Sequence, residues 1–297
     1  MSSQQIAIMS LKQGFVAALD QSGGSTPKAL SGYGIPSEAY KNDEEMFALI
    51  HKMRTRIITS PTFTSEKIIA AILFERTMDS EIENKPAADY LWEEKKIVPF
   101  LKIDRGLEDE KDGVRLLKDI PDLNGLLKKA VDKHIFGTKE RSVINKASES
   151  GIKAIVEQQF ALAKKVMSFD LVPILEPEVT ISIPDKEEAE KMLLREIEFN
   201  LMQLKPEDKI ILKLSIPTKN DFYLPLTTEK HILRVVALSG GYSREEADIR
   251  LKKNKGLVAS FSRALLQDLR AQQSDQQFDL LLKKAIDEIY DASVNKD

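Results

Sequence analysis

The sequence predicts a single α/β domain over residues 1–297 with the architecture of a (β/α)8 TIM barrel, and three observations lead to this fold class. Short, nearly continuous apolar runs recur along the chain, as is typical of strands buried on both faces of a parallel sheet. Charged stretches with apolar residues three and four positions apart separate these runs, as is typical of amphipathic helices. The runs number about eight, which is the strand number of the closed barrel.

Each element follows from these two patterns. The expected strands are the apolar runs 15–19, 68–74, 97–103, 135–138, 171–175, 210–214, 234–238 and 257–261. The expected helices are 42–58, 113–132, 147–168, 186–204 and 243–253, and a C-terminal helix over 272–294 closes the domain. A doubly wound open sheet is the competing architecture, but the glycine fingerprint of dinucleotide-binding sheets does not follow the first strand.

Composition excludes several classes of function. The net charge of −3 gives no global basic field, so we expect no nucleic-acid partner. The absence of cysteine excludes disulfides, thiol nucleophiles and thiolate metal sites, and His51, His134 and His231 are too far apart in sequence for a zinc motif. No apolar stretch reaches the roughly 20 residues of a membrane span. We therefore expect a cytoplasmic protein with neither membrane partner nor cofactor; a carboxylate magnesium site and a homo-oligomer stay open.

Polar side chains cluster where the expected strands end, which is where barrel enzymes assemble their sites. Those with charge are Asp20, Lys102, Asp104, Lys139, Arg141, Glu176, Glu178 and Lys213. Side chains of a strand alternate between its faces, so Lys139 and Arg141 share one face, as do Glu176 and Glu178. We expect these faces to point into one cavity; outward, solvated ion pairs are the alternative for any single pair.

Lys213 suggests a reaction, because it interrupts an apolar run. Burial and a neighbouring cation such as Lys139 both disfavour a charged amine, and a neutral amine attacks carbonyl carbon. Glu176 and Glu178 could then supply one acid and one base for imine formation. Asp20 could take a proton from a substrate hydroxyl and so trigger cleavage of a carbon–carbon bond. An edge-strand lysine pointing at water is the alternative for Lys213.

Two glycine-containing loops predict phosphate sites. Ser239-Gly240-Gly241 follows the seventh strand and offers unhindered backbone N–H groups, and Ser262-Arg263 follows the eighth. Loops at these two positions form the usual phosphate site of barrels. A second anion cradle is expected at Ser22-Gly23-Gly24-Ser25 together with Lys102 or Lys28. Simple turns are the alternative, but two cradles indicate a bisphosphorylated substrate.

In this order along the chain, the motifs resemble class I fructose-1,6-bisphosphate aldolase in its shorter bacterial form. They are Ala18-Leu19-Asp20-Gln21-Ser22, Phe100-Leu101-Lys102-Ile103-Asp104, Val172-Pro173-Ile174-Leu175-Glu176-Pro177-Glu178, Leu212-Lys213 and Leu238-Ser239-Gly240-Gly241. The resemblance implies a metal-independent lyase of glycolysis and gluconeogenesis that reversibly cleaves fructose 1,6-bisphosphate to dihydroxyacetone phosphate and glyceraldehyde 3-phosphate.

The resemblance also implies roles for single residues. Lys213 would form the Schiff base, Glu176 would be the general acid and base, Glu178 and Lys139 would position the lysine, and Asp20 would handle the C4 hydroxyl proton. The ketose-side phosphate would bind Ser239, Gly240 and Arg263, beside Gly241 and Ser262. The other end would bind Ser22, Ser25, Lys102 and Arg141.

Two departures and two alternatives accompany the resemblance. The long animal-type members end in a tyrosine that helps move the C3 proton, whereas this chain ends at Asp297, and Ser262 stands where they have glycine. The nearer alternative is a Schiff-base aldolase for another phosphosugar such as tagatose 1,6-bisphosphate. The more distant one is a non-catalytic barrel that only binds phosphosugars.

Overall fold

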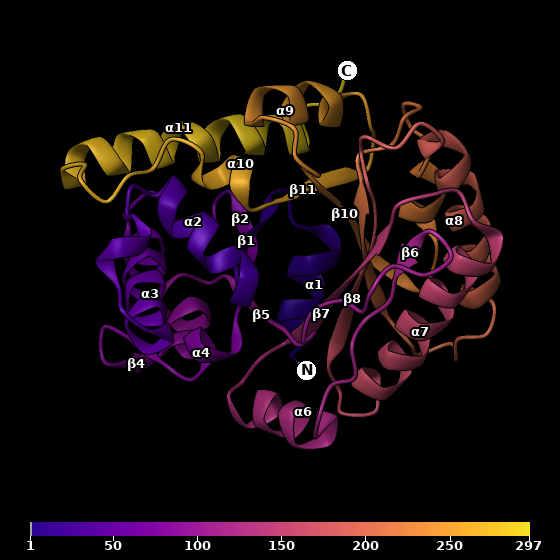
Figure 1. Cartoon of the computed structure of the whole chain (residues 1–297), viewed down its shortest axis with the longest axis horizontal. Helices are drawn as coiled ribbons and strands as arrows, with labels where there is room; N and C mark the ends of the chain where they lie inside the picture. The colour runs from indigo at the N-terminus through magenta and orange to yellow at the C-terminus, as the bar shows by residue number, and fades with distance from the viewer. Residues whose placement is uncertain (1) are drawn as a thin grey trace.

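The computed structural model describes residues 2–297 and shows a closed barrel (Figure 1). Eight parallel strands pair in the order β5-β2-β1-β11-β10-β9-β8-β7, and a β5–β7 pairing closes the ring. Their bounds are β1 Phe15–Leu19, β2 Ile68–Leu73, β5 Val98–Lys102, β7 Gly137–Ile144, β8 Val172–Val179, β9 Ile210–Ser215, β10 Ile232–Leu238 and β11 Leu257–Phe261. The predicted (β/α)8 barrel is confirmed.

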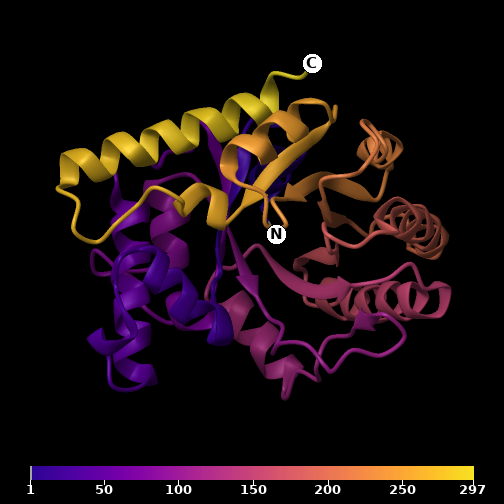
Figure 2. The same ribbon diagram turned by 45° about the horizontal axis from the view of Figure 1, so that its top comes forward.

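Helices surround the barrel, with α1 at its N-terminal end and the others outside the strands (Figures 1 and 2). They are α1 Ser3–Leu11, α2 Thr26–Gly32, α3 Asp43–Thr59, α4 Glu75–Met78, α5 Ala87–Asp89, α6 Leu123–Asp132, α7 Glu149–Met167, α8 Lys186–Leu201, α9 Arg244–Lys252, α10 Arg263–Leu266 and α11 Asp275–Val294. The short elements are β3 Glu81–Ile82, β4 Lys85–Pro86, β6 Val114–Arg115, the 3-10 turns η1 Gly23–Ser25, η2 Ser37–Ala39 and η4 Leu224–Thr228, and the π-helical turn η3 Tyr90–Glu94. No helix within residues 2–297 is long and apolar enough to cross a bilayer.

The helix expected over 113–132 is wrong in its first half. Val114 and Arg115 instead form β6, which pairs antiparallel with the end of β7. The helix begins only at Leu123, because the carboxylate of Asp122 accepts a hydrogen bond from the Gly125 N–H at 3.1 Å and caps it there. Val114 and Leu117 are buried through this hairpin and Leu116 is half-buried, which explains why their spacing resembled a helix.

Alternation along each strand separates two apolar cores. On β9, Leu212 and Leu214 face the helix layer, whereas Ile211 faces inward and packs in the barrel interior. The N-terminal end of the barrel is filled by α1, whose Met9 is fully buried in the same interior core. Arg234 of β10 holds this helix by donating to the carbonyl oxygens of Met9 at 2.8 Å and Lys12 at 3.1 Å. Polar side chains on the inward faces are therefore concentrated at the opposite, C-terminal end.

Candidate active site

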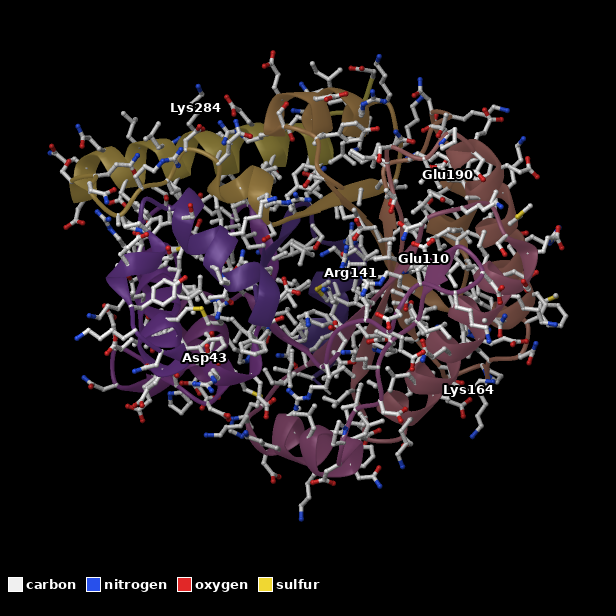
Figure 3. The ribbon with its side chains drawn as sticks, in the orientation of Figure 1. Asp43, Glu110, Arg141, Lys164, Glu190 and Lys284 are labelled. Carbon is white, nitrogen blue, oxygen red and sulfur yellow. The ribbon has the colours of Figure 1, made fainter. Side chains whose placement is uncertain are left out.

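A cavity of about 1260 Å³ opens at the C-terminal ends of the strands. Its lining brings together every residue that the sequence predicted for the site: Asp20, Ser22, Ser25, Lys102, Lys139, Arg141, Glu176, Glu178, Lys213, Ser239, Gly240, Gly241, Ser262 and Arg263. Arg141 is drawn near the middle of the molecule and Lys284 at its upper edge (Figure 3), and only Arg141 of these two lines the cavity. Strand periodicity therefore turned the paired charges inward.

Lys213 lies deep in this cavity and is only 4% exposed. It stands one inward position beyond Ile211 on β9, so the strand places its amine directly above the apolar interior core. Lys213 Nζ lies 3.1 Å from Glu176 Oε1, on the neighbouring strand β8. The alternative of a solvated edge-strand lysine is wrong. The carboxylate is close enough to exchange a proton with the amine.

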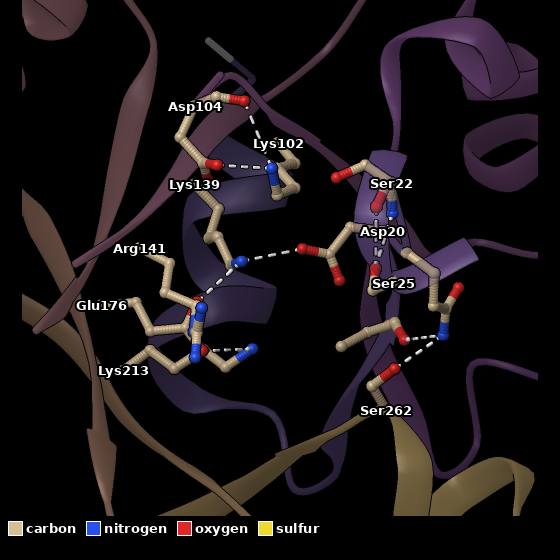
Figure 4. A network of polar contacts seen from close by, with 12 residues as sticks. Asp20, Ser22, Ser25, Lys102, Asp104, Lys139, Arg141, Glu176, Lys213 and Ser262 are labelled. Atoms are coloured by element: carbon tan, nitrogen blue, oxygen red, sulfur yellow. Dashed lines mark hydrogen bonds and ion pairs between the residues drawn. The ribbon is translucent and has the colours of Figure 1, made fainter. Parts of the chain in front are cut away.

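Lys139 of β7 connects this pair to Asp20 (Figure 4). Its Nζ lies 2.7 Å from Glu176 Oε2 and 2.8 Å from Asp20 Oδ2. Burial alone would lower the pKa of Lys139, but the charges of Asp20 and Glu176 outweigh it and raise the pKa well above its ordinary range. Burial would likewise raise the pKa values of Asp20 and Glu176, and the neighbouring lysines lower both. Both carboxylates are therefore ionised at neutral pH.

The two glutamates of β8 have different partners. Glu176 contacts the two lysines, whereas Glu178 Oε2 accepts a hydrogen bond from Arg141 Nε at 2.5 Å. Attraction to Glu178 overcomes burial and raises the pKa of Arg141. Glu178 is thus paired with Arg141 rather than with Lys213. The expectation of one protonated glutamate is not met by Glu176, because two lysines stabilise its charge.

Two loops supply the groups suited to phosphate. After β10, Gly240 and Gly241 have φ of 61° and 121°, which favour glycine, and a Cβ on Gly240 would lie 2.6 Å from Ile181 Cγ2. A Cβ on Gly241 would lie 3.9 Å from Arg263 Nη2, so the guanidinium reaches this turn. Backbone N–H groups, hydroxyls and a cation therefore meet at one place, as phosphate binding requires.

The second cradle follows β1 and lies across the cavity from Lys213 (Figure 4). Ser25 Oγ accepts from the Ser22 N–H at 3.0 Å and donates to the Ser22 carbonyl oxygen at 2.9 Å, which fixes the turn. On the facing wall, Lys102 Nζ lies 2.5 Å from Asp104 Oδ1. Lys28 also lines the cavity.

Sequence reasoning missed several polar residues at the site. Gln21 lines the cavity, and its Nε2 donates to Ser262 Oγ at 2.6 Å. Arg54 of α3 donates to the carbonyl oxygen of Gln21. The position of Gln21, directly after Asp20, was the one available signal; Arg54 lies in a helix and gave none. Glu140 lies outside the cavity lining: it is fully buried on β7, between the inward-facing Lys139 and Arg141, and that position was its only signal in the sequence. Within residues 2–297 no cluster of three or more His, Asp or Glu side chains is arranged to hold a metal ion.

A lysine buried against a carboxylate suits chemistry on a carbonyl carbon, and flanking anion cradles suit a phosphorylated compound. Fold and site together define a barrel enzyme of the Schiff-base lyase type.

Comparison with curated relatives identifies the family within this class of enzymes. The chain is 55% identical over 295 residues to the class 1 fructose-bisphosphate aldolase of Porphyromonas gingivalis, covering 99% of this chain and 100% of that protein. It is 55% identical over 294 residues to the class 1 fructose-bisphosphate aldolase of Clostridium acetobutylicum, with the same coverage. The chain belongs to the class 1 fructose-bisphosphate aldolase family.

A solved structure supports the fold. Fructose-bisphosphate aldolase from Plasmodium falciparum, in a ternary complex with TRAP and a small-molecule inhibitor, superimposes with a TM-score of 0.75 at 20% identity over 99% of this chain and 94% of that chain. No protein-family model matches the chain. Because both curated relatives are named as enzymes, the non-catalytic phosphosugar-binding barrel is not favoured.

Proposed function

We propose that the protein reversibly cleaves fructose 1,6-bisphosphate to dihydroxyacetone phosphate and glyceraldehyde 3-phosphate, in glycolysis and gluconeogenesis, through an imine at Lys213 and without a metal ion. Membership of the class 1 aldolase family supports the reaction. The 3.1 Å contact between Lys213 Nζ and Glu176 Oε1 is the observation that carries the mechanism.

Imine formation begins when the Lys213 amine attacks C2 of the open-chain ketose. Glu176 accepts the proton that the Lys213 amine loses before it attacks. A second proton passes from the nitrogen to the C2 oxygen, which becomes the hydroxyl of the carbinolamine. Glu176 then returns its proton to this hydroxyl, which leaves as water while the iminium forms. Lys139 stays protonated beside Glu176, and its fixed charge favours the ionised carboxylate between these steps. Glu178, through its bond to Arg141, holds a substrate-binding cation in place rather than the nucleophile.

Cleavage then breaks the C3–C4 bond. Asp20 accepts the C4 hydroxyl proton, the C4–O bond becomes a carbonyl, and the bonding electrons pass to the iminium, which becomes an enamine. Lys139 lowers the proton affinity of Asp20, so we infer that this proton moves as the carbon–carbon bond breaks rather than before it. Protonation at C3 and hydrolysis of the imine release dihydroxyacetone phosphate and restore Lys213.

The two cradles support one orientation of the substrate in the cavity. Ser239, Gly240, Gly241, Ser262 and Arg263 hold the C1 phosphate, and Ser22, Ser25, Lys102 and Arg141 hold the C6 phosphate. Both cations of the second group are paired with carboxylates, so binding exchanges one anionic partner for another. Cations at both ends favour a substrate with two phosphates over one with a single phosphate.

We also propose that residues 1–297 act as one barrel domain with a C-terminal helix, in the cytoplasm, without cofactor, nucleic-acid or membrane partners, and with self-association left open. The lack of cysteine and the net charge of −3 support this setting.

Borohydride reduction tests the proposal. Incubation with dihydroxyacetone phosphate and borohydride should add one reduced triose to the peptide that contains Lys213, and none to the Lys139 peptide. Omission of borohydride is the control. An intact mass without adduct, or an adduct on another lysine, would contradict the imine at Lys213. The remaining alternative is addressed by comparing turnover of fructose and tagatose 1,6-bisphosphates; equal turnover of the two C4 epimers would contradict the specific assignment.

A further inference from the structure

Arg54 is an arginine in an unusual place, because it is 1% exposed and lies beneath the loop that follows β1. It comes from the middle of α3, and its Nη1 donates to Thr77 Oγ1 of α4 at 2.8 Å. Its Nη2 donates to the Gln21 carbonyl oxygen and, at 3.4 Å, to Gln21 Oε1. The guanidinium thus ties α3 and α4 to the residue between Asp20 and Ser22.

The burial of Arg54 is costly for the fold. Its hydrogen-bond partners are all uncharged oxygens, and its Nε is buried without a partner among the described residues. A buried cation without a paired carboxylate is unfavourable. Burial lowers the pKa of Arg54 to about 10, against the attraction of Asp20, so the side chain remains charged at neutral pH. A role at the site accounts for a residue that packing alone would disfavour.

Gln21 extends the contact to the other phosphate loop. Its side-chain Nε2 donates to Ser262 Oγ at 2.6 Å, directly before Arg263 at the start of α10. Thr77, Arg54, Gln21 and Ser262 therefore form a continuous series of hydrogen bonds. This series joins the loop after β1 to the loop after β11, and so joins the two proposed phosphate cradles.

We propose that Arg54 is a positioning residue for aldol cleavage: by holding the main chain of Gln21, it fixes Asp20 and Ser22 relative to Ser262 and keeps both phosphate cradles at the spacing of one substrate. This proposal rests on the function proposed above for these residues. Arg54 does not line the cavity and hydrogen-bonds only Thr77 and Gln21 among the described residues, so it acts through the loop. A displacement of about 1 Å at a reacting group can cost about 100-fold in rate, which sets the expected scale.

The experiment compares Arg54→Met with Arg234→Met. Arg234 is a matched control, because it also holds main-chain carbonyl oxygens but does so at the opposite end of the barrel. For Arg54→Met we expect kcat/KM for fructose 1,6-bisphosphate to fall about 100-fold, with kcat lower and KM higher. Arg234→Met should stay within about twofold of the wild type in both constants under conditions where it is folded. Borohydride trapping of dihydroxyacetone phosphate on Lys213 should persist in Arg54→Met, because Glu176 and Lys139 are untouched.

Chemical rescue provides a readout that general destabilisation would not give. Millimolar guanidinium should restore activity of Arg54→Ala at least tenfold and leave Arg234→Ala unchanged. If Arg54→Met does not fold, Arg54→Lys is tested in its place, and we expect its kcat/KM to fall about tenfold. Its thermal midpoint is compared with that of Arg234→Lys.

Three results would overturn the proposal: wild-type constants in folded Arg54→Met or Arg54→Lys, equal losses in the Arg54 and Arg234 variants, or no response to guanidinium. Failure of the wild type to trap at Lys213 would instead contradict the proposed function, so the two failures are distinguishable.

Discussion

Lys213 and Glu176 form an ion pair of 3.1 Å at the bottom of the cavity, and neither residue is more than 4% exposed. The other oxygen of the same carboxylate lies 2.7 Å from Lys139. One buried anion therefore lies between two amines, and water has little access to any of the three. Lys139 contacts two carboxylates and can serve as a permanent cation, whereas Lys213 contacts one and can serve as the nucleophile.

Replacing Lys213 with Met should abolish cleavage, by about 10⁴-fold or more, because the other deeply buried amine, Lys139, is held as a cation between Asp20 and Glu176. The fold should persist, since Glu176 keeps Lys139 as its partner. Turnover in a coupled assay and the thermal midpoint by circular dichroism measure the two effects. Lys283→Met, on the exposed face of α11, is the control. Substantial activity in folded Lys213→Met would contradict the assignment.

Glu176→Gln and Glu178→Gln should differ in which kinetic constant they change. The first removes the proton acceptor beside Lys213, so kcat should fall about 10²- to 10³-fold. The second frees Arg141 from its partner, so the main effect should be on KM. Steady-state kinetics of both variants tests this difference. A larger loss of kcat in Glu178→Gln than in Glu176→Gln would indicate that Glu178, and not Glu176, is the proton acceptor.

Arg141→Met and Arg263→Met should be separable with a substrate that has only the C1 phosphate. Arg141→Met should lose about 10- to 100-fold in kcat/KM on fructose 1,6-bisphosphate and change little on fructose 1-phosphate, since loss of one charge-assisted phosphate contact is worth this much. Arg263→Met should lose activity on both. The measurement is the ratio of kcat/KM on fructose 1,6-bisphosphate to kcat/KM on fructose 1-phosphate for each variant. If Arg141→Met loses activity on both substrates and Arg263→Met only on the bisphosphate, the substrate binds in the opposite orientation.

Glu140→Gln should stabilise the protein at alkaline pH. Glu140 is fully buried and neither carboxylate oxygen has a partner among the described residues. Burial, together with the charge of Asp104, raises its pKa well above the ordinary value, so the folded protein keeps a proton that the unfolded chain has lost at neutral pH. The free energy of unfolding therefore falls as the pH rises above the ordinary pKa of a glutamate.

Urea unfolding at pH 5 and pH 8 measures this dependence. Glu140→Gln, which keeps the shape of the neutral acid, should match the wild type at pH 5 and exceed it by about 1–3 kcal/mol at pH 8. Glu157→Gln on the exposed face of α7 is the control. Equal stabilities at pH 8 would show that Glu140 ionises in the folded protein.

Prolonged treatment with EDTA should leave the rate of cleavage unchanged, because the proposed mechanism stabilises the developing charge through the iminium at Lys213. The wild type is assayed before and after dialysis, with added Mg²⁺ and Zn²⁺ as separate arms. Loss of turnover on chelation, restored by either ion, would indicate a metal-assisted aldol cleavage instead.

The sequence was sufficient for the barrel and for most of the cavity, since both follow from short-range patterns. Each strand was recognisable as an apolar run, and period-two alternation turned Lys139 with Arg141, and Glu176 with Glu178, toward one interior. The apolar run expected for this strand ended at Thr138, whereas β7 extends to Ile144, because the apolar signal stops at the charged residues that the barrel then encloses. The hairpin at β6 was taken for a helix, since spacing alone does not separate the two in a short segment.

Pairing within the cavity could not be predicted from spacing. Period two places Glu176 and Glu178 on one face, but the height of each above the core decides that one meets the lysines and the other meets Arg141. Arg54 was beyond prediction for a different reason: its contact with Gln21 spans 33 positions and joins a helix to a loop. Such contacts depend on the packing of whole elements, which no local pattern encodes.

Helix α1 closes the N-terminal end of the barrel, so substrate and products can pass only through the opposite end. With Met9 sealed into that end, the ketose enters and both trioses depart through the mouth formed by the strand ends. In the proposed mechanism, glyceraldehyde 3-phosphate is free once the carbon–carbon bond breaks, whereas dihydroxyacetone phosphate is still covalently bound to Lys213 on β9. That mechanism therefore predicts sequential release with the aldehyde first, and in the synthetic direction it requires dihydroxyacetone phosphate to be bound to Lys213 before the aldehyde arrives.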